Sequence, residues 1–230
     1  MKRSLRIGVL ALQGAFREHA KTLRQLGAEV VEVRLPEELE GLDGLVVPGG
    51  ESTTIMRLAR SSGLDQAIRR FRGPIFGTCA GMIVLDREHL GLADIEVERN
   101  AFGRQVRSFE ADVDLDGEDT PVRGVFIRAP RIRGAGSDVK VLGELDGEPV
   151  LVRDGHLLLA SFHPELTDDG RVHERFLEMV RAATHVPDGS LASVPRGNSA
   201  RARAPEESEV QQPERGGAGL RPAGAARSGA

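Results

Sequence analysis

The only cysteine of the chain, Cys79, lies in a Gly-x-Cys-x-Gly frame formed with Gly77 and Gly81. The frame follows a short apolar run, 74–76, that is typical of a buried strand. A strand that turns sharply into a helix needs small flanking residues, because neighbouring backbone passes close by. In this nucleophile elbow the side chain stands clear of the sheet, and the helix N-terminus favours a thiolate. The pattern indicates a cysteine nucleophile; a buried core cysteine is the alternative.

A cysteine nucleophile needs a base, and His163 is the best placed of the six histidines. It follows the apolar run Leu157–Ala160, and catalytic groups collect at strand ends in α/β folds. Pro164 favours an extended backbone at His163, and in an extended segment Glu165 points back along the same side. Its carboxylate would then hold the far imidazole nitrogen and set the tautomer. Taken singly, a surface histidine and a solvated glutamate are the commoner interpretations; together with Cys79 they predict a Cys–His–Glu triad.

The other five histidines have no neighbouring acid in a comparable strand-end position. His19 and His173 are expected to be ordinary helix residues, and His185 is assigned to the C-terminal segment. No Cys/His cluster has zinc-site spacing, so neither a metal nor a cofactor is expected.

Acyl chemistry also needs hydrogen-bond donors for an oxyanion. The N–H group of Ala80, at the helix start after the cysteine, is one candidate. A second donor is expected from the turn at 48–52, where Gly49 and Gly50 let backbone amides approach a ligand and permit a peptide flip. The alternative is a plain turn before a helix capped by Ser52, and both interpretations can hold together.

The first half of the chain alternates strand-like and helix-like segments, which predicts βαβ units and a parallel sheet. The second half has short β-like runs separated by Gly, Asp and Pro turns, which favours hairpins or mixed sheet edges. The expected strands are 7–12, 29–33, 45–47, 74–76, 96–100, 108–113, 124–127, 139–145, 149–153 and 156–162, and the expected helices are 16–26, 53–60, 64–71 and 171–182.

Composition narrows the class of protein. The chain has 230 residues and a formal net charge of -4, so neither nucleic acid nor an anionic membrane is expected as its main partner. No apolar stretch is long enough to span a membrane, no signal peptide is recognised, and a reducing cytoplasm is the expected compartment. Residues 186–230 are rich in Gly, Ala, Pro, Ser and Arg and contain no aromatic residue. We expect one domain over 1–185 and a disordered tail over 186–230.

With these motifs the chain resembles the class I, triad-type glutamine amidotransferases, and within them the glutaminase subunits of pyridoxal 5'-phosphate synthase. The resemblance covers about residues 5–182. The Gly-x-Cys-x-Gly and His-Pro-Glu motifs are typical of the whole superfamily, whereas the Leu-Gln-Gly, Arg-Asn-x-Phe-Gly-Arg-Gln and Phe-Ile-Arg-Ala-Pro motifs are specific to these subunits. The matching stretches are 8–14, 17–19, 48–54, 76–81, 98–105, 124–130 and 161–167.

The resemblance implies a three-layer, flavodoxin-like α/β fold with a mostly parallel central sheet and helices on both faces. It implies hydrolysis of L-glutamine to L-glutamate and ammonia through a thioester, with Cys79 as nucleophile, His163 as base and Glu165 as its orienting acid. The ammonia would pass through a channel to a separate synthase subunit that makes pyridoxal 5'-phosphate.

The resemblance also implies binding residues. An arginine fork suits the α-carboxylate of the substrate. Gly50 and Ala80 would form the oxyanion hole, and Gln13 and Gly49 would lie near it and near the partner interface. The family's glutamine-binding positions fall on Gly50, Glu51, Ser52, Arg99, Ile127 and Arg128.

Two other classes of function remain open at this point. A free-standing hydrolase with a cysteine elbow would need no partner and would take its acid from a different strand. A non-catalytic regulatory or scaffold subunit would have no use for an aligned Cys, His and Glu. Reactivity of the Cys79 thiol separates the two enzymes from the scaffold.

Overall fold

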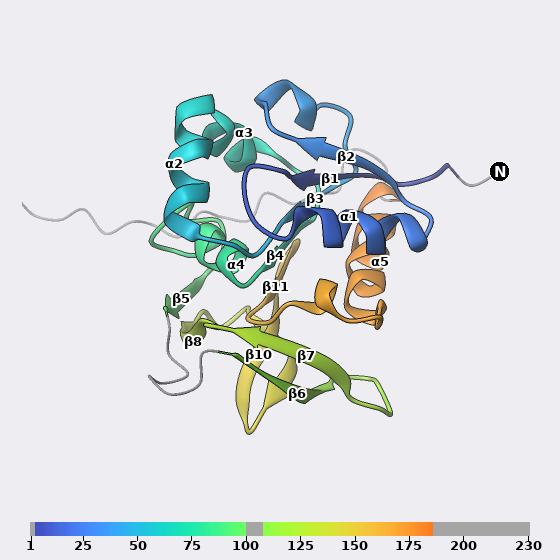
Figure 1. Cartoon of the computed structure of the whole chain (residues 1–230), viewed down its shortest axis with the longest axis vertical. Helices are drawn as coiled ribbons and strands as arrows, with labels where there is room; N and C mark the ends of the chain where they lie inside the picture. Colours follow the sequence, from blue (N-terminus) through green and yellow to red (C-terminus); the bar gives the residue numbers. More distant parts are fainter. Residues whose placement is uncertain (1–2, 100–107, 186–230) are drawn as a thin grey trace, which may run out of the picture. The chain divides into compact units, whose positions relative to one another are not determined.

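The computed structural model describes residues 3–99 and 108–185, so the expected tail lies outside the described residues. Strands and helices alternate through the first half of the chain, and strands dominate the second half until a last helix (Figure 1). The strands are β1 (Arg6–Leu10), β2 (Glu29–Val33), β3 (Gly44–Val47), β4 (Ile75–Thr78), β5 (Ile95–Glu98), β6 (Ser108–Leu115), β7 (Val122–Ile127), β8 (Arg131–Ala135), β9 (Lys140–Leu145), β10 (Glu148–Asp154) and β11 (Leu157–Ala160). The helices are α1 (Phe16–Gln25), α2 (Ser52–Ser62), α3 (Leu64–Arg70), α4 (Ala80–Leu85) and α5 (Arg171–Thr184), with short 3-10 turns η1 (Pro36–Leu39) and η2 (Pro164–Leu166).

The main sheet has the strand order β2-β1-β3-β4-β11-β10-β9-β6-β7. The strands from β2 to β11 pair in parallel, and β10, β9, β6 and β7 extend the sheet in antiparallel pairs. The parallel part consists of continuous apolar runs because helices cover both of its faces. Every residue of β3, β4 and β11 is buried. Because β3, β4 and β11 run parallel to one another, their carboxyl ends lie side by side at the same edge of the sheet.

Helices cover both faces of the parallel strands (Figure 1). On one face α2, α3 and α4 contribute Ile55, Leu64 and Val84 to an apolar cluster. On the other face α1 and α5 contribute Leu23 and Phe176 to a second cluster. The predicted three-layer α/β fold, with a mostly parallel central sheet and helices on both faces, is confirmed.

Some sequence predictions differ from the structure in detail. The strand β8 was not predicted, since its two arginines and a glycine give little strand signal; it forms only in a two-stranded sheet with β5. Residue 100, the last of the expected strand 96–100, lies outside the described residues. The extended segment expected at Glu165 was wrong, because Pro164–Leu166 is the 3-10 turn η2.

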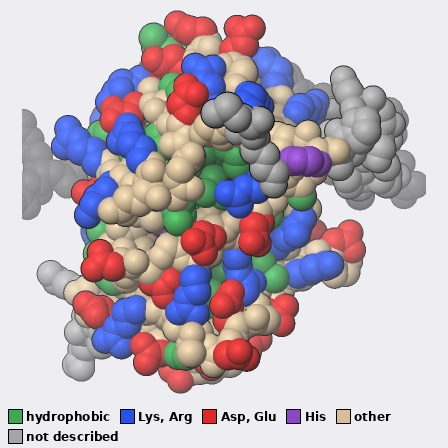
Figure 2. Space-filling view, turned by 90° about the vertical axis from the view of Figure 1, so that its right-hand side faces the viewer, with side chains coloured by type: hydrophobic (Ala, Val, Ile, Leu, Met, Phe, Trp, Pro, Cys, Tyr) green, Lys and Arg blue, Asp and Glu red, His purple; other side chains and the backbone are tan. Residues whose placement is uncertain are grey.

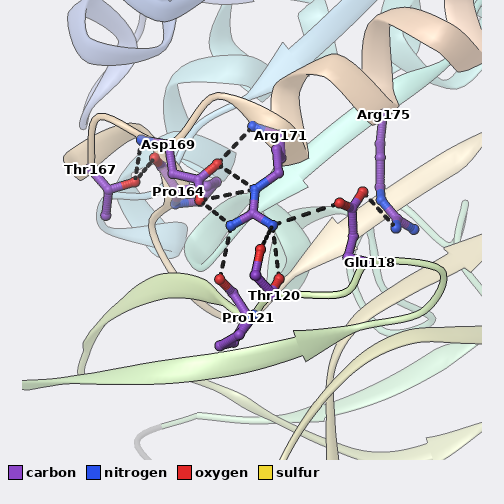
Figure 3. A network of polar contacts seen from close by, with 8 residues as sticks. All are labelled: Glu118, Thr120, Pro121, Pro164, Thr167, Asp169, Arg171 and Arg175. Carbon is purple, nitrogen blue, oxygen red and sulfur yellow. Dashed lines mark hydrogen bonds and ion pairs between the residues drawn. The ribbon is translucent and has the colours of Figure 1, made fainter.

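A polar network around Arg171 ties the start of α5 to the β6–β7 hairpin (Figure 3). The guanidinium donates to the Thr120 carbonyl through Nη1 and to the Pro121 carbonyl through Nη2, each at 2.8 Å. It also pairs with Asp169 at 2.6 Å and Glu118 at 3.6 Å. The planar arginine fork satisfies backbone and carboxylate acceptors at once, which an ammonium group does not do. The hairpin is thereby held against the helix.

The surface carries charges of both signs. Figure 2 shows Lys and Arg side chains interspersed with Asp and Glu on the face drawn, with hydrophobic side chains visible between them. This mixture agrees with a net charge of only -4. Within the part of the chain that the structure describes, the helices are too short or too polar for any of them to cross a bilayer.

Candidate active site

Cys79 lies at the junction of β4 and α4 with a strained backbone. Its φ of 48° and ψ of -107° fall in a region that non-glycine residues rarely occupy. The N–H of Cys79 donates to the Ala160 carbonyl at 2.8 Å, which continues the pairing of β4 with β11 beyond the last strand residue. Strain of this kind persists only where the surroundings impose it, and it is typical of functional sites.

The glycines of the Gly-x-Cys-x-Gly frame are required by close packing. A Cβ atom on Gly81 would clash with the Val47 carbonyl oxygen of the neighbouring strand. A Cβ atom on Gly77 would lie 2.7 Å from Cδ1 of Leu85. The frame therefore exists because the turn from β4 into α4 passes directly against β3.

His163 and Glu165 form a buried hydrogen-bonded pair. Nδ1 of His163 lies 2.7 Å from Oε1 of Glu165, and the two residues are 6% and 5% exposed. The N–H of His163 donates to the Val125 carbonyl of β7 at 2.8 Å. Although Glu165 is in a 3-10 turn rather than an extended segment, its carboxylate still reaches back two residues. The second ring nitrogen, Nε2, is left to exchange a proton with Cys79.

The electrostatics favour a charged pair. Burial by itself lowers the pKa of His163, but hydrogen bonds and charge interactions with Cys79 and Glu165 outweigh it and raise that pKa to about 10. Burial opposes ionisation of Glu165, yet the histidines around it hold the pKa of its carboxyl below the usual range. At neutral pH this arrangement holds His163 as an imidazolium next to an ionised Glu165, with Cys79 on its other side.

The turn that contains Gly49 packs against His163 and Cys79. The Gly49 carbonyl accepts the N–H of Ala15 at 3.1 Å, and the Gly49 N–H donates to Oγ1 of Thr78 at 3.0 Å. A Cβ atom on Gly49 would clash with Cε1 of His163 and lie 3.2 Å from Cβ of Cys79. The turn is thus in van der Waals contact with the candidate nucleophile and base.

The loop between β1 and α1 packs against this turn. Gly14 has a φ of +95°, and a Cβ atom on it would clash with the Gly49 carbonyl oxygen. Oε1 of Gln13 accepts the N–H of Glu51 at 2.6 Å and lies against Gly50. Gln13 and Gly14 therefore pack against the turn that contains Gly49 and Gly50.

The prediction that Ser52 caps α2 was wrong. The N-cap is Glu51, whose carboxylate accepts the N–H of Thr54 at 3.2 Å and the hydroxyl of Thr53. The Thr53 hydrogen bond is the main reason that the pKa of Glu51 lies below its ordinary value. Ser52 is the first residue of the helix and is buried. A carboxylate reaches the N–H groups of the first turn better than a residue already inside the helix.

The expected binding residues lie on two sides of the cysteine. The Ile127 carbonyl oxygen lies 3.9 Å from Sγ of Cys79. Arg128, the next residue, has a φ of 46°, a second strained backbone conformation close to the nucleophile. Ala80 is buried at the first position of α4, directly after Cys79.

Arg99 is held by a short polar chain. The fully buried carboxylate of Asp86 accepts Nδ1–H of His89 at 2.8 Å, which leaves Nε2 of His89 as an acceptor for the Arg99 guanidinium at 2.8 Å. In the segment 86–91, which follows α4, Asp86 and Leu90 are buried. The family motif that continues from Arg99 falls on residues 100–105, outside the described residues.

Sequence reasoning missed three polar residues behind Glu165. His19 of α1, His173 of α5 and Thr78 of β4 are fully buried, and His19 contacts both of the others. The available signal was a histidine within the apolar stripe of each of two amphipathic helices. Among the described residues, no group of three or more His, Cys, Asp or Glu side chains is arranged to hold a metal ion.

Known proteins resemble this chain over most of its length. The model of the SNO glutamine amidotransferase family matches residues 9–182. "Pyridoxal 5'-phosphate synthase subunit PdxT" of Niallia circulans is 53% identical over 189 residues, which cover 78% of this chain and 100% of that relative. The protein of the same name from Thermus thermophilus is 56% identical, covering 75% of this chain and 96% of its own length.

A solved structure extends the comparison to three dimensions. A crystal structure titled as a glutamine amidotransferase superimposes with a TM-score of 0.72 at 51% identity, covering 76% of this chain and 98% of that one. The family resemblance predicted from the motifs is therefore confirmed, and the chain belongs to the SNO glutamine amidotransferase family.

Proposed function

We propose that this chain is the glutaminase subunit of a pyridoxal 5'-phosphate synthase, with Cys79, His163 and Glu165 as its catalytic residues. The observation that carries the proposal is the buried 2.7 Å contact between His163 and Glu165 directly beside a cysteine elbow. A thiolate next to an imidazolium is the nucleophile that amide hydrolysis through a thioester requires. The relatives named pyridoxal 5'-phosphate synthase subunit PdxT support the assignment to that enzyme.

The first half of the reaction forms a thioester. The Cys79 thiolate attacks the side-chain carbonyl carbon of L-glutamine, and the carbonyl electrons move to oxygen. The backbone N–H groups of Ala80 and Gly50 hold that oxyanion. The His163 imidazolium gives its proton to the departing nitrogen, the C–N bond breaks, and ammonia and a glutamyl thioester remain.

The second half restores the enzyme. Neutral His163 takes a proton from water as the water oxygen attacks the thioester carbon. The C–S bond then breaks, L-glutamate leaves, and Cys79 returns as a thiolate beside the imidazolium. Glu165 holds Nδ1 of His163 throughout, so that Nε2 is the nitrogen that carries the proton in both steps.

Substrate recognition is assigned to residues around the cysteine. We propose that Arg99 and Arg128 hold the α-carboxylate, because a guanidinium fork matches a carboxylate in two hydrogen bonds. Gly50, Glu51, Ser52 and Ile127 would complete the pocket through the turn and the end of β7. The hydrogen bond that the Arg99 guanidinium donates to Nε2 of His89 supports this role, because it fixes the guanidinium.

The partner is a synthase subunit that consumes the ammonia in making pyridoxal 5'-phosphate. We propose that its docking rearranges the Gly49–Gly50 peptide, with Gln13 at the same surface, and so completes the oxyanion hole. The cytoplasm is the proposed compartment, since a reducing environment keeps the single cysteine as a thiol.

The test measures glutamate release from L-glutamine by the full chain, alone and with the synthase subunit from the same source. Cys79→Ala is the inactive variant, and Gly134→Ala, on a strand away from the site with room for a methyl group, is the matched control. Activity that rises with the partner and is absent in Cys79→Ala supports the proposal. Equal activity without the partner would indicate a free-standing hydrolase, and inactivity in both states a scaffold subunit.

A further inference from the structure

A cluster of buried polar side chains lies behind the proposed triad, on the side of Glu165 away from His163. Nε2 of His19 is 3.3 Å from Oε2 of Glu165 and 3.0 Å from Oγ1 of Thr78. Nδ1 of His19 is 2.9 Å from Nε2 of His173. Four elements, α1, α5, β4 and η2, each contribute one member to this group.

The cluster is sealed from water. His19, His173 and Thr78 are all 0% exposed. The ring of Phe76 meets His19 and His173 edge-on, with centroids 5.9 Å and 5.6 Å away. Burying polar groups is costly unless they are hydrogen-bonded, and an apolar side chain at either histidine would fill the space without that cost. Two histidines in this position therefore indicate a role other than filling the core.

The hydrogen-bond directions follow from the acceptors. Burial lowers the pKa of His19, and burial followed by its neighbour His19 lowers that of His173 to about 3, so both rings are neutral. Nε2 of His19 is hydrogen-bonded to Oγ1 of Thr78, whereas Oε2 of Glu165, 3.3 Å from the same nitrogen, has no hydrogen-bond partner in the described structure. The anionic oxygen so close to Nε2 still favours the His19 tautomer with the proton on that nitrogen. Nδ1 of His19 then accepts from Nε2–H of His173, whose own Nδ1 has no hydrogen-bond partner in the described structure.

Thr78 extends the cluster to the oxyanion turn. Its Oγ1 accepts the N–H of Gly49 at 3.0 Å while it faces Nε2 of His19. One imidazole is therefore in contact with the orienting acid of the base and with the hydroxyl that fixes the backbone of the turn.

We propose, on the basis of the function proposed above, that His19 is a positioning residue for glutamine hydrolysis. Its Nε2–H lies 3.3 Å from Oε2 of Glu165 and stabilises the negative charge of that carboxylate beside His163, and through Thr78 it sets the position of the Gly49 turn. His173 fixes the tautomer of His19. Neither histidine touches the substrate, so their effect is on the rate of the chemical steps rather than on glutamine binding.

The test compares His19→Leu, His19→Gln and His19→Asn in the assembled complex with the synthase subunit. Leu removes the donor at similar size, Gln places an amide N–H near the position of Nε2, and Asn places one near Nδ1. Exposed His185, whose Nδ1 contacts only the Arg181 carbonyl of its own helix in the described structure, provides the control His185→Leu.

We expect His19→Leu to lower kcat about 10- to 100-fold, the usual effect of losing an outer-shell partner, with KM for glutamine little changed. His19→Gln should keep most of the activity and His19→Asn should not. Thr78→Val should lower kcat, and Thr78→Ser should restore it, because only the hydroxyl is at issue.

A second readout is the pH dependence of Cys79 alkylation by iodoacetamide, which reports the thiolate–imidazolium pair directly. The titratable groups that act on His19 are Glu165, His163, His173 and, on its own helix, Glu18. Without the Nε2–H donor, the buried Glu165 carboxylate is less stable as an anion and supports His163 less well. The midpoint of alkylation should then move to higher pH in His19→Leu and stay in place in His185→Leu.

A folded His19→Leu variant with unchanged kcat and alkylation midpoint overturns the inference. If that variant does not fold, equal activity of the Gln and Asn variants, or of Thr78→Val and Thr78→Ser, overturns it. The proposed function is judged separately in the same assay by Cys79→Ala: full activity there defeats the function itself, whatever the His19 variants do.

Discussion

Each oxygen of the Glu165 carboxylate faces a different histidine. Oε1 contacts His163 at 2.7 Å, and Oε2 faces His19 at 3.3 Å. The hydrogen bond at Oε1 orients the imidazole, and the His19 ring beside Oε2, which has no hydrogen-bond partner in the described structure, stabilises the carboxylate by its charge distribution. At the scale of single residues, the site depends on short polar and van der Waals contacts around Cys79.

Gly49→Ala should abolish most of the activity. The new methyl group would clash with Cε1 of His163 and crowd Cβ of Cys79, so the base must move. A misplacement of about 1 Å costs on the order of 100-fold in rate. We expect kcat/KM to fall by about that factor in the glutamate-release assay, while circular dichroism stays unchanged. Normal activity of a folded Gly49→Ala protein would show that the turn has room to move.

The charged pair of His163 and Glu165 should make stability depend on pH. The pKa of His163 rises from 6.5 to about 10 in the fold, so its contribution is complete below pH 6.5 and is lost as pH rises toward 10. The pKa of Glu165 falls from 4.5, so its contribution is complete above pH 4.5 and is lost in acid. The pair therefore stabilises most between pH 4.5 and 6.5.

Urea unfolding of wild type and Glu165→Gln checks this. The difference in free energy of unfolding should be largest near pH 6 and should shrink steadily above about pH 7, since the imidazolium is what the carboxylate stabilises. A difference that stays constant or grows up to about pH 9 would contradict the charged pair.

At the scale of elements, the site depends on how α5 and the β6–β7 hairpin are joined. Arg171 binds the hairpin through the carbonyls of Thr120 and Pro121 (Figure 3). The Val125 carbonyl of β7 in turn accepts the N–H of His163. A helix start far from the cysteine therefore helps to fix the strand on which the base rests.

Arg171→Lys should loosen this clamp. An ammonium group keeps the charge but cannot bond Asp169 and both carbonyls at once. Because the side chain is 27% exposed, we expect a loss of about 1.5 kcal/mol in the free energy of unfolding, at the low end for hydrogen bonds to a charged group. The control Arg123→Lys changes an arginine on the outer face of the same hairpin and should have no measurable effect. Equal Tm values for the two variants would show that the clamp carries no stability.

At the scale of the whole molecule, the catalytic unit and the remainder of the chain are separable in sequence. The family match ends at residue 182, and the relative from Niallia circulans is covered over its full length by 78% of this chain. We expect a chain ending at His185 to keep the glutaminase activity of the full chain with the synthase subunit. A loss of activity on truncation, with the Tm unchanged, would assign a function to the residues that follow.

Much of this molecule could be predicted from local sequence patterns. Buried strands such as β3 and β4 are short apolar runs between turn residues such as Gly and Pro. The turn at Cys79 could be recognised from the sequence because only glycine fits on either side of it. β8 could not be predicted, because its pairing with β5 comes from tertiary contact and not from its own residues. The carboxylate of Glu165 was expected next to His163, although the backbone between them is a 3-10 turn.

The role of His19 was missed for a different reason. The sequence around it shows a histidine in the apolar stripe of a helix but not its partners, since His173 and Thr78 are 154 and 59 residues away. Only the packing of α1 and α5 on the same face of the sheet brings them together. Local patterns therefore located the proposed catalytic residues, and the fold alone located the buried polar residues behind them.

The contact between Gly14 and the Gly49 carbonyl determines which positions of the chain tolerate amino-acid substitution. Position 14 bears no functional group, yet any side chain there would push the turn into the nucleophile. In a deep mutational scan it should score as intolerant as the catalytic residues, whereas Gly117 and Gly147, which share a positive φ but face open space, should accept asparagine. Library design for altered substrate range should therefore leave positions 14 and 49 fixed together and vary the pocket elsewhere.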